Sequence, residues 1–277
     1  MGKIYDALEK ADKQEKPAEG GRAMPERQRT EKAPEENVVQ FVGNALKHSD
    51  TRLDINLITY HRPQSVEAEL FKVLRTNLLF PAEGNPPKSI LVTSAVPGDG
   101  KSFVSANLAI SIAAGLEDYV LLMDCDIRRP SLHTCFGYGT TRGLSDYLNG
   151  QAPLETLLHK TPFPRLTLLP GGRPPRNPTE LLSSKRMRTM LDEVVHRYDD
   201  RFIIIDSPPP SMAAEVAAIA KQVDGVLMVV RSGKTPRSAV TDTIEQIGKE
   251  KILGIVLNQA QQSVKKYYGY SKGYYRE

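Results

Sequence analysis

The 277-residue chain contains no tryptophan, only two cysteines (Cys125 and Cys135), five histidines and no long apolar run. Two cysteines in a chain of this length exclude a disulfide-rich scaffold and are typical of reduced thiols in the cytoplasm. The scattered histidines exclude the usual spacing of a zinc site. No apolar run approaches the roughly 20 residues that cross a bilayer, and the first residues lack the apolar core of a secretory signal. We therefore expect a cytoplasmic protein.

The charge imbalance is also small. The net charge is only +4, which does not predict a nucleic-acid partner, because such proteins concentrate basic residues on one face. Hydrophobic residues make up 40% of the chain and charged residues 25%, which is the balance of a globular domain with a substantial core.

Residues 1–60 differ in composition from the rest of the chain. Residues 3–11 have the spacing of a short amphipathic helix, a candidate tether to a partner. From Glu9 to Glu36 the only apolar side chains are alanines and Met24, too few to offset the entropy cost of ordering. We expect a disordered linker there, a globular domain over residues 61–262 and a flexible tail over residues 263–277.

Short runs rich in Val, Ile and Leu alternate with helical patterns through the globular part. Six such runs occur at residues 89–94, 119–124, 166–170, 202–206, 225–230 and 252–258. Because they do not alternate with polar residues, they indicate strands covered on both faces. Apolar residues recur every four positions from Val66 to Leu78, which predicts a helix capped by Ser65. Asn177–Pro178 and Thr235–Pro236 are expected helix starts. The pattern predicts a doubly wound, mostly parallel α/β sheet, and the Gly-x-Gly-Lys-Ser turn at residues 98–102 after its first strand makes a P-loop NTPase the expected type.

The segment after the first strand has the residues of a phosphate-binding loop. Gly98 and Gly100 let backbone N–H groups converge on phosphate oxygens, Lys101 neutralises them, and the Ser102 hydroxyl binds Mg²⁺. The loop deviates from the usual motif, because Ala95 stands where the first glycine belongs. We expect a nucleotide site formed by Gly98, Asp99, Gly100, Lys101, Ser102 and Phe103.

Aspartates end two of the apolar runs. Asp124 and Asp126 follow one strand and Asp206 ends another, so they lie at the edge where such folds bind ligands. Because like charges raise one another's pKa, this grouping calls for a cation, and Mg²⁺ prefers oxygen ligands. Asp206 fits a metal-holding role and Asp124 that of the base for an attacking hydroxyl. Asp126 is a candidate for the metal or for fixing its loop through Arg128.

Aromatic residues gather in the last thirteen residues, "KKYYGYSKGYYRE". Glycines separate them and no Val, Ile or Leu follows Val264, so nothing nearby buries them. A phenol is a poor nucleophile unless a base and a metal-bound phosphate assist it. The cluster is either a set of phosphorylation sites, a sticky disordered tail or a stacking surface for single-stranded nucleic acid. Its members are Tyr267, Tyr268, Tyr270, Tyr274 and Tyr275.

Four elements together resemble the bacterial tyrosine autokinases (BY-kinases) of capsule and exopolysaccharide systems, in their CpsD/CapB-like branch. They are "VPGDGKS" (96–102), "LLMDCDIRR" (121–129), "IIIDSPP" (203–209) and the tyrosine cluster. The resemblance spans roughly residues 65–277. It implies an ATP- and Mg²⁺-dependent kinase that phosphorylates its tail tyrosines between subunits, with Lys101, Asp124 and Asp126 in catalysis. It also implies that Asn258 contacts adenine.

The resemblance extends to partners. Family members carry an E-x-x-R-x-x-R helix that builds a ring such as an octamer, and the matching residues here are Glu69, Lys72 and Arg75. Lysine lacks the planar fork of arginine, so the triplet is also compatible with a solvated helix face bearing an ion pair. Relatives imply a membrane-embedded polysaccharide co-polymerase adaptor that recruits the kinase to the inner face of the membrane, and a cognate tyrosine phosphatase.

Two other functions remain open. A partitioning-type ATPase would use the nucleotide as a switch, but its relatives carry a second lysine five residues before the loop lysine, where this chain has Val96. A scaffold whose ATP site only fixes assembly would bind nucleotide without turnover.

Overall fold

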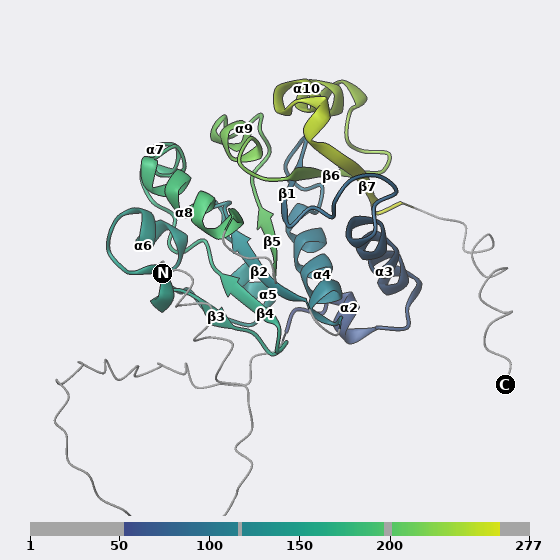
Figure 1. Ribbon diagram of the computed structural model, residues 1–277, viewed down its shortest axis with the longest axis horizontal. Coiled ribbons are helices and arrows are strands. Elements are labelled where there is room, and N and C mark those ends of the chain that lie inside the picture. The colour runs from purple at the N-terminus through teal and green to yellow at the C-terminus, as the bar shows by residue number, and fades with distance from the viewer. Residues whose placement is uncertain (1–52, 116–117, 197–200, 261–277) are drawn as a thin grey trace, which may run out of the picture.

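The described part of the computed structural model is one seven-stranded sheet with helices on both faces (Figure 1). It comprises residues 53–115, 118–196 and 201–260. The expected helix over residues 3–11 and the five tail tyrosines lie outside these ranges. The strand order is β3-β4-β2-β5-β1-β6-β7, and every pairing is parallel except that of β3 with β4. This confirms the predicted doubly wound class.

The strands lie close to the predicted runs. They are β1 (Ser89–Ser94), β2 (Tyr119–Asp124), β3 (His159–Lys160), β4 (Leu166–Leu169), β5 (Arg201–Asp206), β6 (Gly225–Arg231) and β7 (Ile252–Asn258). Only β3 was not predicted, because two residues carry no periodic pattern.

Helices separate most of the consecutive strands. They are α2 (Ile58–His61), α3 (Val66–Leu79), α4 (Lys101–Ala113), α5 (Leu132–Cys135), α6 (Leu144–Leu148), α7 (Pro178–Leu182), α8 (Lys185–His196), α9 (Glu215–Ala220) and α10 (Arg237–Ile247), with short 3₁₀ turns η1 (Leu154–Thr156) and η2 (Lys249–Lys251). None of those searched is long and apolar enough to cross a membrane.

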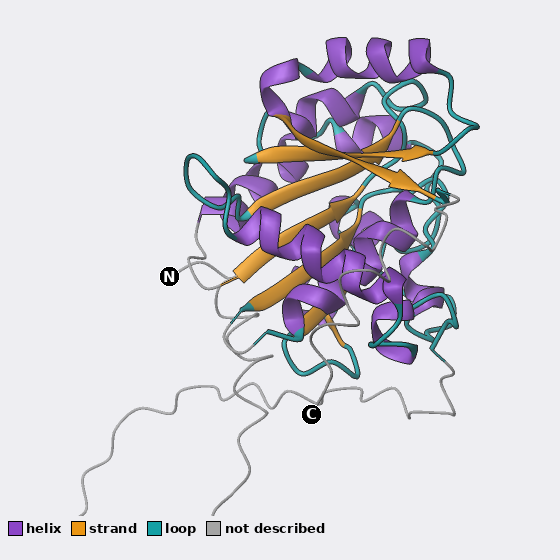
Figure 2. Cartoon of the chain, turned by 90° about the vertical axis from the view of Figure 1, so that its right-hand side faces the viewer, coloured by secondary structure: helices purple, strands orange, loops and turns teal. Residues whose placement is uncertain are grey.

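Helices cover both faces of the sheet (Figure 2), and an apolar core lies on each face. Neighbouring residues of one strand enter different cores, as Ile203 and Ile204 of β5 do, because successive side chains of a strand point to opposite faces. Helices α2, α3, α4 and α5 contribute to the core of Ile204, and α6 to α10 to that of Ile203. Burial on both faces explains why the strands lack polar alternation.

The predicted N-cap residue is observed at one helix and differs from the observed one at another. The Ser65 hydroxyl accepts the Ala68 N–H at 3.2 Å, so the predicted cap of α3 is confirmed. The start predicted at Thr235 is wrong, because the N-cap of α10 is Pro236 and Thr235 bonds elsewhere. Asn177 does precede Pro178 of α7, but its side chain makes no capping bond.

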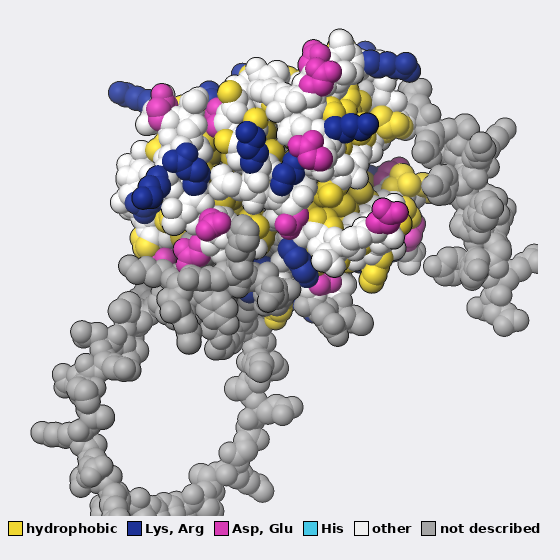
Figure 3. Space-filling view, turned by 45° about the horizontal axis from the view of Figure 1, so that its top comes forward, with side chains coloured by type: hydrophobic (Ala, Val, Ile, Leu, Met, Phe, Trp, Pro, Cys, Tyr) yellow, Lys and Arg dark blue, Asp and Glu magenta, His cyan; other side chains and the backbone are white. Residues whose placement is uncertain are grey.

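The β7 edge of the sheet remains partly open. Five apolar side chains exposed there are Val66, Leu70, Val73, Ile255 and Leu257. They line a groove of about 890 Å³ between α3 and β7, and Figure 3 shows hydrophobic side chains gathered on this side of the molecule. The buried residues of α3 are instead Ala68, Phe71 and Leu78, so most of the four-residue repeat from Val66 faces this groove.

Candidate nucleotide and phosphoryl-transfer site

The phosphate-binding loop lies between β1 and α4, where the strand order reverses. Gly98 and Gly100 have φ of 85° and 94°, in the left-handed region that favours glycine. A Cβ on Gly100 would lie 2.1 Å from the side-chain nitrogen of Asn258. The backbone conformation therefore favours glycine at residue 100, and the loop opens α4 with unsatisfied N–H groups that suit phosphate oxygens.

Lys101, Ser102, Asp126 and Asp206 meet at the base of this loop. Ser102 Oγ donates to Asp206 Oδ2 at 2.5 Å, and Lys101 Nζ lies 3.1 Å from Asp126 Oδ2. Burial lowers the pKa of Lys101, but the carboxylates of Asp206 and Asp126 outweigh it and raise the pKa above its ordinary value. The lysine therefore keeps its positive charge, and carboxylates hold it at the place where phosphates are expected.

Asp124 is fully enclosed, as is Asp206. It lies beside Asp206 in strand register and is 0% exposed. Its carboxylate accepts the backbone N–H groups of Asp126 at 3.2 Å, Ser131 at 2.9 Å and Leu132 at 3.0 Å. In this arrangement it ties the loop after β2 to the strand end.

Two adjacent buried carboxyls cannot both ionise cheaply without a cation. Burial, followed by the charge of Asp206, raises the pKa of Asp124 to about 8. Burial also raises the pKa of Asp206 to about 6, opposed chiefly by the ammonium of Lys101. A hard cation with oxygen ligands would relieve this repulsion, so the donors present fit Mg²⁺. Within the described ranges no three His, Cys, Asp or Glu residues converge as a metal cage, so phosphate oxygens would have to complete the coordination.

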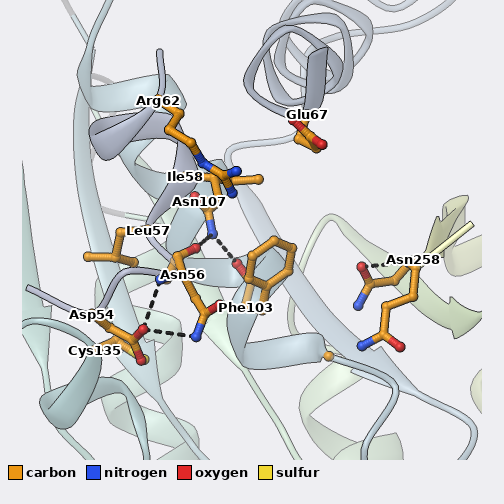
Figure 4. Close-up of a pocket in the computed structure, with 13 residues that line it drawn as sticks. Asp54, Asn56, Leu57, Ile58, Arg62, Glu67, Phe103, Asn107, Cys135 and Asn258 are labelled. Atoms are coloured by element: carbon orange, nitrogen blue, oxygen red, sulfur yellow. Dashed lines mark hydrogen bonds between the residues drawn. The ribbon is translucent and has the colours of Figure 1, made fainter. Parts of the chain in front are cut away.

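A cavity of about 470 Å³ opens beside the phosphate loop. Phe103 and Asn258 flank its central space in Figure 4, and Gly100 also lines it. An aromatic ring and an amide suit the stacking and hydrogen bonding of a nucleobase. Phe103 and Asn258 therefore line one cavity, and their contact with a nucleotide stays a prediction.

The far wall of this cavity was not predicted. Asp54, Asn56, Arg62 and Glu67 line it, from a segment that sequence analysis assigned mostly to the N-terminal part. Buried Asn107 of α4 fixes this segment: its Oδ1 accepts the Thr59 N–H and its Nδ2 donates to Asn56 O, both at 3.0 Å. An asparagine within the apolar helix α4 was the available signal.

A further unpredicted contact holds the phosphate loop from the other side. Thr235 Oγ1 donates to Asp99 Oδ1 at 2.7 Å, and Asn258 Nδ2 donates to Asp99 O at 2.8 Å. Asp99 is only 2% exposed, so its carboxylate points into the protein. Asp99 is thus an anchor of the loop, because its side chain is directed toward Thr235.

Arg128 connects the loop after β2 to two helices. Its guanidinium donates to Thr179 Oγ1 at 2.6 Å and to the buried carboxylate of Glu215 at 2.8 Å. One of the two roles expected for Asp126 was to fix its loop through Arg128. The observed contacts instead lead to α7 and α9.

The expected oligomerisation triplet makes contacts within the chain. Lys72 Nζ lies 2.6 Å from Glu69 Oε1 on the exposed face of α3. Arg75 donates to Ser111 O of α4 at 2.7 Å. A role in assembly remains a prediction for these residues.

The comparisons with known proteins agree with this geometry. The ParA family model, described as NUBPL iron-transfer P-loop NTPase, matches residues 86–271. Tyrosine-protein kinase YwqD of Bacillus subtilis is 35% identical over 81% of this chain and 94% of its own length. Tyrosine-protein kinase CpsD of Streptococcus agalactiae is 37% identical over 79% and 95%.

Solved structures give the same result. The chimerical protein CapA2B2 superposes with a TM-score of 0.68 at 32% identity, covering 75% of this chain and 91% of that one. The kinase domain of Escherichia coli tyrosine kinase ETK gives a TM-score of 0.66 at 29% identity, over 75% and 82%. With its phosphate loop, paired strand-end aspartates and near-complete alignment to these enzymes, the chain belongs to the bacterial tyrosine-protein kinase family of P-loop NTPases.

Proposed function

We propose that the protein is an ATP- and Mg²⁺-dependent autokinase that phosphorylates its own C-terminal tyrosines, in trans between subunits. The observation that carries the proposal is the Lys101–Asp126 ion pair beside Ser102 and Asp206. It places a cation, a hydroxyl and carboxylates at one strand edge. The tail supplies five tyrosines as acceptors.

The chain's own groups divide the task of phosphoryl transfer. Loop N–H groups and Lys101 bind the β- and γ-phosphates, which requires the ammonium to shift from Asp126 toward phosphate oxygens. Ser102 and Asp206 would hold Mg²⁺, and Asp126 would support it; bound Mg²⁺ neutralises charge on the triphosphate. The tyrosine oxygen bonds to the γ-phosphorus, the bond to the β–γ bridging oxygen breaks, and ADP leaves.

The phenolic proton passes to an aspartate, and two acids compete for this role. Asp124 is enclosed and accepts three backbone N–H groups, whereas Asp126 is 8% exposed. We retain both as catalytic candidates, with Asp126 the more open to an incoming phenol. Asp124→Asn would also loosen the loop, whereas Asp126→Asn would leave those backbone bonds in place.

Intact-protein mass spectrometry tests the activity. Phosphatase-treated full-length protein is incubated with ATP and Mg²⁺, and phosphate is mapped on the tail. Wild type should gain several phosphates, and Lys101→Met should gain none. Equal tyrosine phosphorylation of the two proteins would refute the proposal.

The partners follow from the same proposal. We propose a ring-like homo-oligomer through the face of Glu69 and Lys72, a membrane adaptor that recruits the kinase to the inner face of the membrane, a cognate phosphatase, and regulation of polysaccharide assembly or export. The match to the ParA model keeps a nucleotide-gated switch as the second candidate. That function predicts hydrolysis to water without phosphotyrosine.

A further inference from the structure

Three arginines outside the catalytic centre are exposed and have no ion pair within the described ranges. We call Arg129, Arg173 and Arg176 the arginine rim. In the described part of the chain, their guanidinium groups also make no hydrogen bond. Arg128, beside them in sequence, differs sharply, because Thr179 and Glu215 occupy its guanidinium. The guanidinium groups of the rim are therefore available to bind an anion.

Two loops carry the rim, and they lie against each other at the carboxyl edge of the sheet. The strands β2 and β4 are neighbours, and the loops that follow them hold Arg129 and the other two arginines, respectively. A Cβ on Gly171 would lie 2.7 Å from the Cβ of Pro130 and 3.4 Å from the carboxyl carbon of Asp124. The two loops are thus packed over the end of β2.

The rim is also held close to the catalytic acids. The Arg129 N–H donates to the Asp126 carbonyl at 3.0 Å and to its carboxylate at 3.2 Å. The Arg173 carbonyl accepts Ser145 Oγ at 2.9 Å, which fixes the second loop to α6. An anion bound by the rim would lie next to the place where phosphoryl transfer is proposed.

The charge of the tail decides which anion fits. The unmodified tail carries Lys265, Lys266, Lys272 and Arg276, so it gains nothing electrostatically from the rim. One phosphotyrosine adds about −1.5 to −2 charges and oxygens that arginine binds in a bidentate manner. The rim thus distinguishes a tail that has been phosphorylated once from one that has not.

We propose that the arginine rim binds a phosphotyrosine of the partly phosphorylated tail and thereby presents a neighbouring tyrosine to the catalytic acids. The inference rests on the proposed autokinase function. The acceptor tyrosines lie within nine residues of one another, from Tyr267 to Tyr275. A bound phosphate therefore keeps the next tyrosine hydroxyl close to the catalytic acids. Phosphates after the first are added faster than independent encounters would allow.

A binding measurement tests the recognition step alone. The protein is the full-length Lys101→Met variant without ATP, and the probes are fluorescent peptides of residues 264–277, either unmodified or phosphorylated on Tyr270. The phosphorylated peptide should bind about tenfold or more tightly, as expected for new charge-assisted hydrogen bonds. Arg173→Gln/Arg176→Gln should abolish the difference.

The matched control removes two positive charges from the opposite edge of the sheet. Lys221 and Lys249 are exposed and precede β6 and β7, so Lys221→Gln/Lys249→Gln should retain the preference. Equal binding of both peptides to wild-type rim, or equal loss in the control, would overturn the proposal. The proposal would also be overturned if Arg173→Gln/Arg176→Gln lost binding to phosphatidylserine vesicles but still bound the phosphorylated peptide more tightly than the unmodified one.

A second measurement follows phosphoform distributions with time in the active protein. The ratio of the second-phosphate rate to the first-phosphate rate should fall about tenfold in Arg173→Gln/Arg176→Gln and stay at the wild-type value in the lysine control. An unchanged ratio would refute the rim while leaving the autokinase intact. A wild type that forms no phosphotyrosine would refute the autokinase and the rim together.

Discussion

Strands β5 and β7 belong to one parallel sheet, yet their surroundings differ completely. Every residue of β5 is buried, whereas residues of β7 alternate between half-buried and exposed. Both strands end in a polar residue that contacts the phosphate loop or its helix. Asp206 of β5 accepts from Ser102, and Asn258 of β7 donates to the Asp99 carbonyl.

The contrast assigns the chemical step to the buried centre of the sheet and nucleotide recognition to its exposed edge. At the centre of the sheet, charges sit in a dry environment where electrostatic interactions are strong and unbalanced carboxyls are costly. At the edge, water reaches the strand, and the uncharged amide of Asn258 is sufficient to contact the phosphate loop. We therefore expect substitutions at β5 to change turnover and stability strongly, and substitutions of the exposed apolar residues of β7 to change them little.

Asp206→Asn should have the largest effect. Loss of the charge that orders Ser102, Lys101 and bound Mg²⁺ should lower autophosphorylation by about a hundredfold to a thousandfold. Initial rates at saturating ATP measure this. Asp242→Asn, an exposed site on α10, is the matched control and should behave as wild type. A less than tenfold loss in Asp206→Asn would remove Asp206 from the metal site.

Apolar truncations should give the next largest difference. Ile204 of β5 is 0% exposed and Ile255 of β7 is 49% exposed. Ile204→Ala should reduce the free energy of unfolding by about 3 kcal/mol, and Ile255→Ala by less than about 1 kcal/mol. Denaturant unfolding of both variants checks the comparison. Equal losses would mean that β7 is covered in solution, as an assembly through this edge would require.

The paired acids predict a smaller, pH-dependent effect without nucleotide or metal. Folding raises the pKa of Asp206 from 3.8 to about 6 and that of Asp124 from 3.8 to about 8, mainly by burial. The folded state therefore binds more protons than the unfolded state between about pH 4 and pH 8, so stability falls as pH rises through that window.

Wild-type protein should therefore lose stability between pH 5 and pH 8, with the larger share of the loss coming from Asp124. Urea unfolding at both pH values measures it. Asp206→Asn should flatten the dependence, because it removes one titrating carboxyl and the charge that raises the pKa of the other. A wild-type stability that rises over this range would contradict the buried, unneutralised pair.

The same contrast explains what sequence could predict. The core strands follow from continuous apolar runs. Lys101 and Ser102 follow from the glycine-rich loop, and Asp124 and Asp206 follow from their positions at strand ends. The wall formed by Asp54, Asn56 and Arg62 was not predicted, because these polar residues have no periodicity and the only sign of their packing was an asparagine within the apolar helix α4. Thr235 was misassigned because a threonine before proline is compatible with a helix cap, and only the tertiary fold brings Asp99 within reach.

Thr235→Val should give the smallest effect. It tests whether the β6–α10 connection holds the phosphate loop through Asp99. The valine has nearly the same shape but leaves the buried Asp99 carboxylate without its 2.7 Å donor. The phosphate loop should then lose its fixed position, which raises the KM for ATP about tenfold and changes kcat by less than about twofold. Thr235→Ser keeps the hydroxyl and should restore the wild-type KM. If valine and serine at this position behave alike, the hydroxyl does not anchor the loop, and the β6–α10 connection has no part in nucleotide binding.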